Sequence, residues 1–485
     1  MSDLSTALLR QQIHINGQWC DADDGAVIEV TDPASGKVIG TVPKAGAAET
    51  ARAIAAAQDA FLSFSRTTNE ERAAMLRRLH GLIVEKREAL AQLLTLEQGK
   101  PLSEARGEVD MSAKYILWFA EEARRIYGDI IPSPWKNRQL MVLHEPVGVV
   151  AAITPWNFPS SMLARKIGPA LAAGCTLVIK PATQTPYSGL AWAELCAEAG
   201  FPAGAVNIVT GSASAIGGEL TSNPLVRKIT FTGSTGIGKL LMTQAAASVK
   251  RVSMELGGNA PFIVFDDADV DAAVAGALAS KYRNSGQTCV CTNRIYVQAG
   301  IHDRFVQRLT EATAAMRVGN GFEDGVGQGP LIDDKAVAFM EELVADAVEN
   351  GGTIALGGKR HALGGNFFEP TIITNASEAM RVSRDEIFGP VAPVFRFETE
   401  EEVIRLANAT EYGLACYFYT ADLGRSFRVM RELEYGIVGV NEGLVTTEVA
   451  PFGGFKESGI GREGSKYGIT EYTETKYVSL GGLGK

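Results

Sequence analysis

A cysteine in a glycine-containing loop is the residue in this sequence best suited to covalent chemistry. The stretch NSGQTCVC, residues 284–291, contains Cys289 and, two residues later, Cys291. A cysteine acts as a nucleophile when the backbone lets a substrate approach, a base takes the thiol proton and a donor stabilises the oxyanion. Glu255, which precedes the Gly-Gly turn of MELGGNAPFIVF, is the candidate base. The alternative is that Cys289 is an inert, buried cysteine.

Four other stretches contain candidate functional residues, and three of them could contact an anionic ligand. Asn157 in TPWNFP could donate its amide to an oxyanion, and Lys180 in VIKPATQTP could meet a ribose hydroxyl or a phosphate. Backbone amides of FTGSTGIGK, residues 231–239, could hold a phosphate at a helix N-terminus. Glu386 precedes a Phe-Gly-Pro turn. The plain alternatives are a turn asparagine, a solvated lysine, an ordinary strand-to-helix turn and a surface carboxylate.

The composition is that of an ordinary globular protein. The 485 residues are 46% hydrophobic and 21% charged, and we expect about two to four domains. The net charge of −10 argues against nucleic acid as a main partner. No run approaches the ~18 apolar residues of a membrane span. Six scattered cysteines, with no zinc spacing and no signal peptide, predict a cytoplasmic protein without a metal site.

Alternating strand and helix patterns predict two doubly wound α/β domains, because such alternation is typical of parallel sheets. Short strands precede residue 43, and long helices cover 47–64, 71–97 and 103–127. Strand and helix then alternate from residue 147 to 248 and again from 261 to 436, with a long helix over 269–284. Three prolines and an alternating pattern near residues 128–148 predict a β-hairpin that leaves the domain, and TETKYVSLGG predicts a final strand.

Taken together, these motifs resemble those of the aldehyde dehydrogenase superfamily. Seven of them occur in the family's order across residues 10 to 480: TPWNFP, VIKP, FTGSTGIG, ELGGNAPFIVF, GQTC, EIFGP and PFGGFKESGIGRE. A narrower set is similar to the succinate-semialdehyde dehydrogenase branch, with glutarate-semialdehyde dehydrogenase inside it: LTLEQGKPL, YGDIIP, KYRNSGQTCVCTNR, GPLID, EYGIVGVNEG and GREGSKYGI.

The resemblance implies a domain organisation. A Rossmann-like dinucleotide-binding domain would contain residues 1–129 and 145–255, and a catalytic domain residues 256–465. A small β flap for oligomerisation would combine residues 130–144 and 466–485. Chains of this branch are usually tetramers, so we expect a homotetramer built as a dimer of dimers.

The resemblance also implies a mechanism. Cys289 attacks an aldehyde, and the Asn157 side chain and the Cys289 amide hold the oxyanion of the thiohemiacetal. Hydride passes to a nicotinamide, and water activated by Glu255 hydrolyses the resulting thioester. The residues implied in cofactor binding are Thr154, Pro155, Trp156, Lys180, Thr183, Gly233, Ser234, Gly238, Leu256, Glu386 and Phe388.

The position three residues after Lys180, the lysine that could meet a ribose hydroxyl, bears on the choice of cofactor. NAD-preferring members of the family have a glutamate there that binds the adenosine ribose, whereas this chain has Thr183. Without that carboxylate nothing repels a 2′-phosphate, and Lys180 can attract it. We therefore expect NADP to be preferred, with NAD as the alternative.

Two arginines match those that the branch uses to hold the far carboxylate of its substrate. They are Arg165 and Arg283, and a guanidinium can bind a carboxylate with two parallel bonds. Thr446 stands where members often have serine, which leaves the role of its hydroxyl open. The expected substrate is succinate semialdehyde, and glutarate semialdehyde, one methylene longer, is the alternative. Structural ion pairs are the alternative role for the arginines.

Two other classes of function remain open. A CoA-acylating aldehyde dehydrogenase uses a thiol in place of water, but such enzymes typically lack the base that Glu255 provides. A non-catalytic protein on the same fold is disfavoured by the presence of Cys289, Asn157 and Glu255 together.

Cys291 has two possible roles. In an extended loop residues i and i+2 point the same way, so its sulfur could face that of Cys289. The Cα separation would be roughly 6 to 7 Å, near the upper limit for a disulfide. The resemblance points to a redox switch, because one is described in some relatives with this pair. The alternative is that Cys291 only packs behind the loop.

Overall fold

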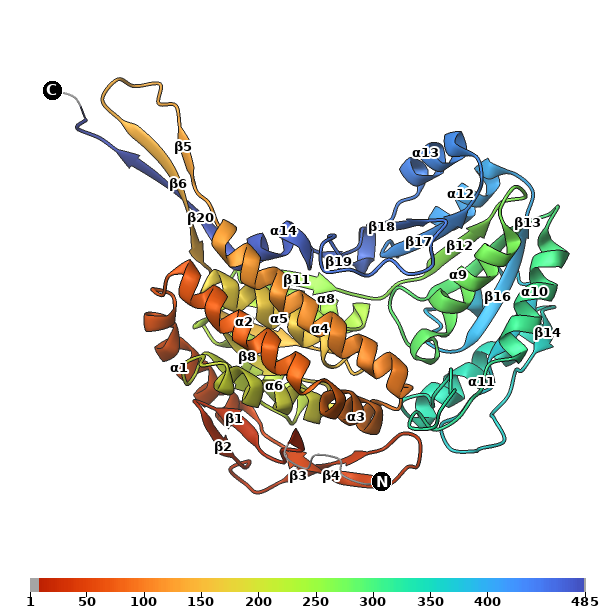
Figure 1. Ribbon diagram of the computed structural model, residues 1–485, viewed down its shortest axis with the longest axis horizontal. Coiled ribbons are helices and arrows are strands. Elements are labelled where there is room, and N and C mark those ends of the chain that lie inside the picture. Colours follow the sequence, from red (N-terminus) through yellow and green to blue (C-terminus); the bar gives the residue numbers. More distant parts are fainter. Residues whose placement is uncertain (1–7, 484–485) are drawn as a thin grey trace.

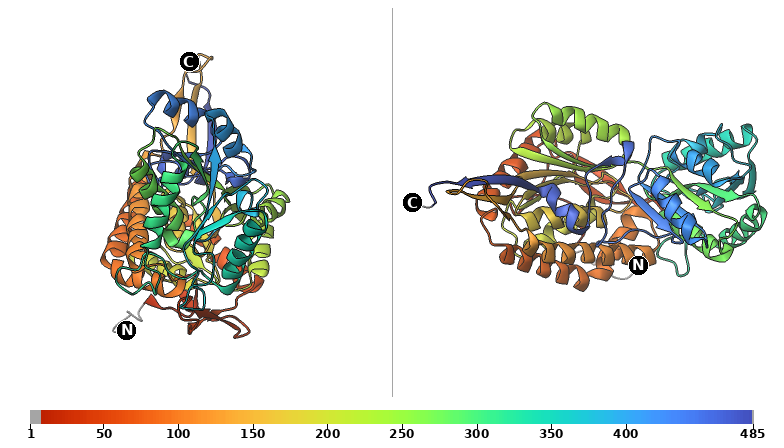
Figure 2. Two further views of the ribbon diagram at one scale, coloured as in Figure 1. Left: turned by 90° about the vertical axis from the view of Figure 1, so that its right-hand side faces the viewer. Right: turned by 90° about the horizontal axis from the view of Figure 1, so that it is seen from above.

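The computed structural model describes residues 8–483 and contains two large sheets flanked by helices and one small projecting sheet (Figure 1). Seen from above, the two large sheets with their helices lie side by side, and the small sheet extends from the N-terminal one (Figure 2). The fold class predicted from the sequence is confirmed, since both large sheets have parallel cores covered by helices.

The first sheet has a core of five parallel strands. They are β7 (Val149–Ile153), β8 (Thr176–Lys180), β9 (Val206–Ile208), β10 (Val226–Thr232) and β11 (Arg251–Glu255). The strand order is β11-β10-β7-β8-β9, so the chain moves outward from β7 and then returns to its other side. This reversal opens a crevice at the carboxyl ends of β7 and β10, where ligands of such sheets bind. Antiparallel strands extend both edges: β1 (Ile13–Ile15), β2 (Gln18–Cys20) and β19 (Gly459–Ile460).

Helices cover both faces of this sheet, which suits strands that are buried almost throughout. They are α1 (Ala47–Phe64), α2 (Asn69–Glu85), α3 (Arg87–Gln98), α4 (Leu102–Glu122), α5 (Ser161–Ala173), α6 (Pro186–Glu198), α7 (Ala213–Ser222) and α8 (Thr235–Ala246). The single helix predicted over 71–97 is wrong, because the chain turns at Lys86, whose backbone N–H bonds the carbonyls of Leu82 and Val84. The predicted stop at Gly99 is confirmed, since this glycine caps α3 with a φ of 91°.

The second sheet has six parallel strands and one antiparallel edge strand. Its order is β14 (Thr353–Leu356), β15 (Thr371–Thr374), β16 (Val391–Phe397), β13 (Thr292–Gln298), β12 (Ala260–Val264), β17 (Ala415–Tyr419) and β18 (Ile437–Val440). Its helices are α9 (Val270–Tyr282), α10 (His302–Ala314), α11 (Asp334–Glu349), α12 (Glu400–Asn408) and α13 (Leu423–Glu432). The loop with Cys289 connects α9 to β13.

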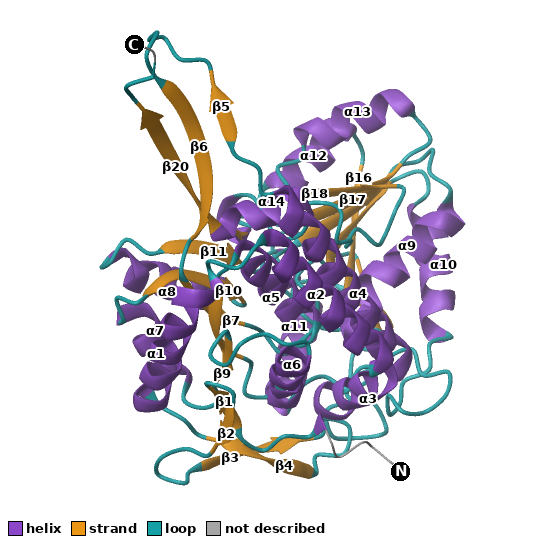
Figure 3. Cartoon of the chain, turned by 60° about the vertical axis from the view of Figure 1, so that its left-hand side comes forward, coloured by secondary structure: helices purple, strands orange, loops and turns teal. Residues whose placement is uncertain are grey.

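The small sheet joins segments far apart in the sequence and projects from the body of the molecule (Figure 3). It contains β5 (Asp129–Ile131), β6 (Gln139–Pro146) and β20 (Thr473–Leu480), and β20 pairs with β6 over its full length. The predicted hairpin and final strand are thus present. A separate hairpin, β3 (Val27–Thr31) with β4 (Val38–Pro43), and the short α14 (Ser465–Gly468) complete the α-helices and β-strands of residues 8–483. Among the described residues, no helix has the length and apolar character needed to cross a membrane.

Candidate active site

Two cavities of about 220 and 240 Å³ meet at Cys289, which lines both of them. We call the first the arginine cavity, because Arg165 and Arg283 line it, and the second the glycine cavity, because Gly233 and Gly257 line it. A reactive thiol at such a junction can contact two different ligands at once.

A left-handed turn delivers Cys289 to this junction. The helix predicted to reach residue 284 ends at Tyr282, and Asn284, Ser285 and Gly286 follow with φ values of 52°, 58° and 77°. Such a conformation is costly for residues other than glycine and persists only where contacts impose it. Gly286 is required here, because an added Cβ would lie 2.2 Å from the Gly389 carbonyl oxygen.

Gly258, which follows β11, also lets the chain pass close to the backbone of Cys289. A Cβ added at Gly258 would lie 2.4 Å from the carbonyl oxygen of Cys289. The Gly-Gly turn after Glu255 therefore permits the close backbone contact expected from the sequence.

The side-chain amide of Asn157 is held in one orientation beside this loop. Its Oδ1 accepts a bond of 3.1 Å from the backbone N–H of Phe158, and its Nδ2 donates to the Gln287 carbonyl at 3.0 Å. The Nδ2 group has a second hydrogen, which this arrangement leaves for an oxyanion.

The Cys289 thiol is protonated at neutral pH in this environment. Burial is the main cause that raises its pKa to about 12, and the carboxylates of Glu386 and Glu255 add to the rise. Arg165 and Arg283 act in the opposite direction but do not offset it. Since the thiolate is the nucleophile, this site needs a base or an additional positive charge before Cys289 can react.

Glu255, at the end of β11, has the properties of a base. The residue is 3% exposed, and its Oε2 has no hydrogen-bond partner within residues 8–483. Burial and the nearby Glu463 raise its pKa well above 4.5, while Lys166 and Arg165 counteract part of that rise. A carboxylate with a raised pKa can take up a proton near neutral pH.

Sequence reasoning missed Lys166 and Glu463, two of the charged residues that act electrostatically on Glu255. Lys166 on α5 bonds Glu463 at 2.8 Å and also the hydroxyls of Thr230 and Thr232. Both charged side chains are buried, and Glu463 comes from the C-terminal segment. Glu463 lies in GREG and Lys166 lies in a helix, and neither local sequence predicts a buried charge. Only the tertiary structure buries them.

The glycine cavity brings together seven of the eleven residues implied in cofactor binding. They are Pro155, Trp156, Gly233, Ser234, Leu256, Glu386 and Phe388. Phe388 has a left-handed φ of 50° and packs edge-on against Trp156, with ring centroids 5.5 Å apart. Ser234 is the N-cap of α8 without a side-chain cap bond, so backbone amides there can hold a phosphate.

The other four implied residues lie outside the lining of this cavity. Lys180 ends β8, and burial lowers its pKa to about 8. Thr154 follows β7, and its buried hydroxyl has no partner among the residues described. Gly238 allows α8 to pack on Leu256, since an added Cβ would lie 2.4 Å from Leu256 Cδ2. Thr183 is half-buried beyond the end of β8.

The residues of this edge of the sheet suit a dinucleotide. Glu386 accepts a bond of 2.9 Å from the Gly258 amide, and burial raises its pKa to about 7. The unpartnered Thr154 hydroxyl and the buried Lys180 ammonium are polar groups that a ribose or phosphate can satisfy.

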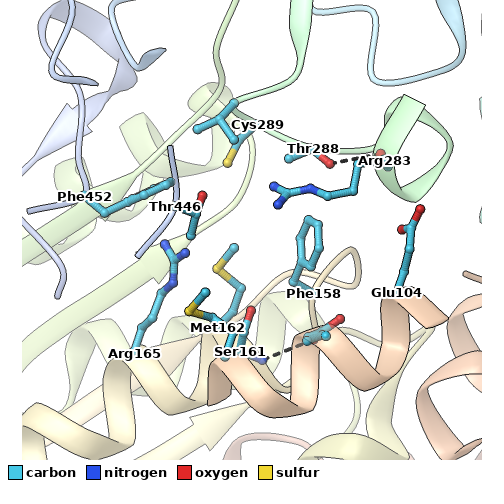
Figure 4. A pocket seen from close by; sticks show the side chains of 14 residues that line it. Glu104, Phe158, Ser161, Met162, Arg165, Arg283, Thr288, Cys289, Thr446 and Phe452 are labelled. Atoms are coloured by element: carbon cyan, nitrogen blue, oxygen red, sulfur yellow. Dashed lines mark hydrogen bonds between the residues drawn. The ribbon is translucent and has the colours of Figure 1, made fainter. Parts of the chain in front are cut away.

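The arginine cavity presents its cations from opposite sides. Figure 4 shows Arg165 beside Thr446 and Phe452, with Arg283 across the cavity beside Phe158 and the Cys289 sulfur directed between them. Arg165 is 3% exposed, and its Nε and one terminal nitrogen have no hydrogen-bond partner in the described chain. Its closest carboxylate, Glu463, is 3.6 Å away and bonded to Lys166. A buried guanidinium with free N–H groups is a site for an anion.

Cys291 lies behind the loop. It is 4% exposed, and its Sγ donates to the carbonyls of Lys281 at 3.2 Å and Thr292 at 3.4 Å. Both cysteines of the pair are free thiols. A Cys289–Cys291 disulfide would require Cys291 to leave these carbonyls, so the redox role stays a prediction.

Comparisons with known proteins agree with this geometry. The model of the aldehyde dehydrogenase family matches residues 19–478. The chain is 61% identical to glutarate-semialdehyde dehydrogenase of Pseudomonas aeruginosa, covering 98% of this chain and 99% of that protein. It is 59% identical to the NADP(+) succinate-semialdehyde dehydrogenase GabD of Escherichia coli, covering 98% of each. A crystal structure of an E. coli NADP-dependent enzyme superposes with a TM-score of 0.98 at 59% identity, covering 99% of this chain and 100% of that chain.

The raised pKa of Cys289 predicts how its alkylation depends on pH. Without ligands, the rate of reaction with iodoacetamide should rise about tenfold per pH unit from pH 7 to 10, because the thiolate fraction does so far below the pKa. Mass spectrometry of the Cys289 peptide measures the rate, and Cys289→Ala is the control. A plateau below pH 8 would show that the thiolate is already present at rest.

The position of Cys291 gives a second prediction. After mild peroxide, Cys289 in the wild type should lose its reactivity toward iodoacetamide and regain it with dithiothreitol, because a bond in so small a loop is readily reduced. In Cys291→Ala the loss should be at most partly reversible. Equal recovery in both proteins would show that Cys291 only packs behind the loop.

Proposed function

Because the chain belongs to the aldehyde dehydrogenase family, we propose that this NAD(P)-dependent enzyme oxidises a dicarboxylic semialdehyde to the dicarboxylate. Succinate semialdehyde is the proposed substrate and glutarate semialdehyde the alternative, since relatives of nearly equal identity carry each name. The observation that carries the proposal is Arg165, a buried guanidinium with unpartnered N–H groups in the cavity that ends at the Cys289 thiol.

The residues divide the chemistry between them. Glu255 takes the thiol proton as the Cys289 sulfur bonds to the aldehyde carbon, and the free Nδ2 hydrogen of Asn157 and the Cys289 amide stabilise the oxyanion. Glu255 releases this proton to solvent before it acts again. When bound, the nicotinamide cofactor supplies the acceptor for the hydride. Glu255 then takes a proton from the water that attacks the thioester, and the Cys289 sulfur leaves as the thiolate.

Water, rather than a thiol cofactor, is the proposed acyl acceptor. Glu255 is buried, has an unpartnered oxygen and lies near the buried Lys166–Glu463 ion pair. A base of this kind is needed to activate water but is superfluous for a thiol that ionises easily.

The proposed cofactor sites occupy the carboxyl edge of the first sheet. Lys180 and Glu386 would hold the two riboses, and the α8 N-terminus with Gly233 and Ser234 the pyrophosphate. Thr183 carries no charge to repel a 2′-phosphate, and Lys180 is cationic below its pKa of about 8. These features favour NADP, with NAD as the second acceptor.

The small projecting sheet is proposed to mediate a homotetramer in the cytoplasm, built as a dimer of dimers. Apolar side chains are exposed on this sheet, namely Ile130, Leu143, Tyr477 and Leu480. Exposed apolar side chains on a projecting sheet favour contact with another subunit. The three-domain division given in the sequence analysis is part of this proposal.

The function is tested by reduction of NADP at 340 nm with succinate semialdehyde, glutarate semialdehyde and butanal, each with and without CoA. We expect efficient, CoA-independent turnover of a semialdehyde. Turnover that requires CoA would indicate the acylating class, and no turnover of any aldehyde would indicate a non-catalytic protein. A comparison of kcat/KM for the two semialdehydes decides between them.

Replacing the arginines separates charge recognition from catalysis. In Arg283→Leu and Arg165→Met, the KM for succinate semialdehyde should rise by about 10- to 100-fold, because a charge-assisted bond contributes roughly 1.5–3 kcal/mol. The KM for butanal, which has no carboxylate, should change less than about 3-fold by the same reasoning. Equal effects on both substrates would assign the arginines a structural role.

Residue 183 should control the choice of cofactor. In Thr183→Glu the new carboxylate repels the 2′-phosphate, so the KM for NADP should rise by about tenfold or more while NAD is used at least as well. Thr183→Ser is the matched control and should behave as the wild type. A wild type that does not use NADP would refute this assignment.

A further inference from the structure

Four polar side chains at the junction of α3 and α4 reach toward Asn157 and the turn that precedes Cys289. We call Gln98, Lys100, Glu104 and Glu108 the α3–α4 clamp. Lys100 is 1% exposed, and its Nζ lies 2.5 Å from Glu108 Oε2 and 2.7 Å from the Asn157 carbonyl oxygen. The same ammonium lies 4.0 Å from the centre of the Phe158 ring. The side chain therefore has a single, fully determined position.

The clamp also holds the left-handed turn that precedes Cys289. Gln98 Nε2 donates to Asn284 Oδ1 at 2.9 Å, and Glu104 Oε2 accepts the Asn284 backbone N–H at 2.8 Å. Asn284 Nδ2 in turn donates to the Asn157 carbonyl at 2.9 Å. The Asn157 carbonyl oxygen thus accepts hydrogen bonds from both Lys100 and Asn284. It therefore links the turn before Cys289 to the residue that carries the proposed oxyanion donor.

The remaining carboxylate oxygen of Glu108 fixes the segment after Asn157. Glu108 Oε1 accepts the backbone N–H groups of Ser160 at 2.9 Å and Ser161 at 3.1 Å. The chain from Asn157 to the start of α5 is therefore bound to the clamp at both ends.

A role in stability alone accounts poorly for this arrangement. A buried Lys–Glu pair is rarely a net source of stability, because taking both charges out of water costs about as much as their attraction returns. All four clamp residues instead converge on the segment that begins at Asn157 and on the strained turn at Asn284. Strain of this kind persists only where surrounding contacts impose it.

We propose that Lys100, through its bond to the Asn157 carbonyl, is a positioning residue that sets the geometry of the oxyanion donor and the nucleophile turn. The inference rests on the proposed roles of Asn157 and Cys289. Lys100 does not contact either predicted ligand and does not transfer a proton in the reaction. Its loss leaves the Asn157 carbonyl with Asn284 alone, so the Asn157 amide and Cys289 no longer share one fixed geometry.

The expected signature is a loss in kcat without a loss in binding. Glu108 lines the arginine cavity, so the single variant Glu108→Gln is the reference for substrate binding. Lys100 holds neither arginine nor the proposed dinucleotide groups, so loss of Lys100 should leave both KM values within about 3-fold of that reference. Removal of an oxyanion donor typically lowers kcat by about 10²–10³-fold, and a displaced donor should cost at least about tenfold.

The test uses the double variant Lys100→Met/Glu108→Gln, because Lys100→Met alone leaves Glu108 as an unpaired buried carboxylate. The amide oxygen that Glu108→Gln introduces can still accept the Ser160 and Ser161 N–H groups. Steady-state kinetics with succinate semialdehyde and NADP, NADP binding by fluorescence and alkylation of Cys289 are measured in the full-length protein. The control is Lys228→Met/Glu471→Gln, a pair remote from the two cavities in which Lys228 of β10 is buried and the Glu471 side chain is 24% exposed.

A tenfold or greater loss of kcat in the first variant, with KM and NADP binding retained and the control variant unaffected, supports the proposal. A kcat within 3-fold of the wild type, or equal losses in both variants, overturns it. Failure of the proposed function is a separate outcome, because the wild type itself would then fail to oxidise the semialdehyde.

Discussion

The burial of helix α5 is the constraint on which the site depends. Every residue of this helix is buried, including its two adjacent cations, Arg165 and Lys166. Taking an ammonium or guanidinium out of water costs several kcal/mol, so each needs an anion or a set of acceptors. Lys166 hydrogen-bonds Glu463 and two threonines, whereas Arg165 has only a 3.6 Å ion-pair contact with Glu463, makes no hydrogen bond through Nε within the described chain, and lines a cavity. Lys166 thus belongs to a structural ion pair, and Arg165 lies where it can bind an anion.

The same helix places these charges on either side of the reaction centre. Residues 165 and 166 are neighbours, so their side chains diverge by about 100° around the helix axis. Arg165 consequently lines the arginine cavity, while Lys166 is directed toward β10 and Glu463, near Glu255. One turn of one buried helix therefore places one cation in the arginine cavity and another near Glu255.

The sequence predicts the residues at strand ends well, because a doubly wound sheet brings carboxyl ends together whatever its loops contain. Asn157 and Gly233 line the glycine cavity for this reason, and Glu255 ends β11. Cys289 instead precedes β13 and reaches the cavities through the left-handed turn. Lys166 and Glu463 could not be predicted in this way, since a lysine and a glutamate in charged stretches favour surface positions until tertiary packing buries them. The helical pattern extends through the left-handed turn at Asn284, although Asn and Gly are the residues that tolerate such a turn best.

The electrostatics of the two cavities are linked through Cys289. Among the nearby charged groups, Glu386 contributes most to the raised pKa of Cys289, and Glu386 lines the glycine cavity. Ribose hydroxyls that donate to Glu386 would disperse its charge, and an oxidised nicotinamide carries a positive charge. Both changes lower the pKa of the thiol, since a nearby cation or a weakened anion favours the thiolate. The protein's own groups therefore keep the pKa of Cys289 high, and a dinucleotide in the glycine cavity would lower it.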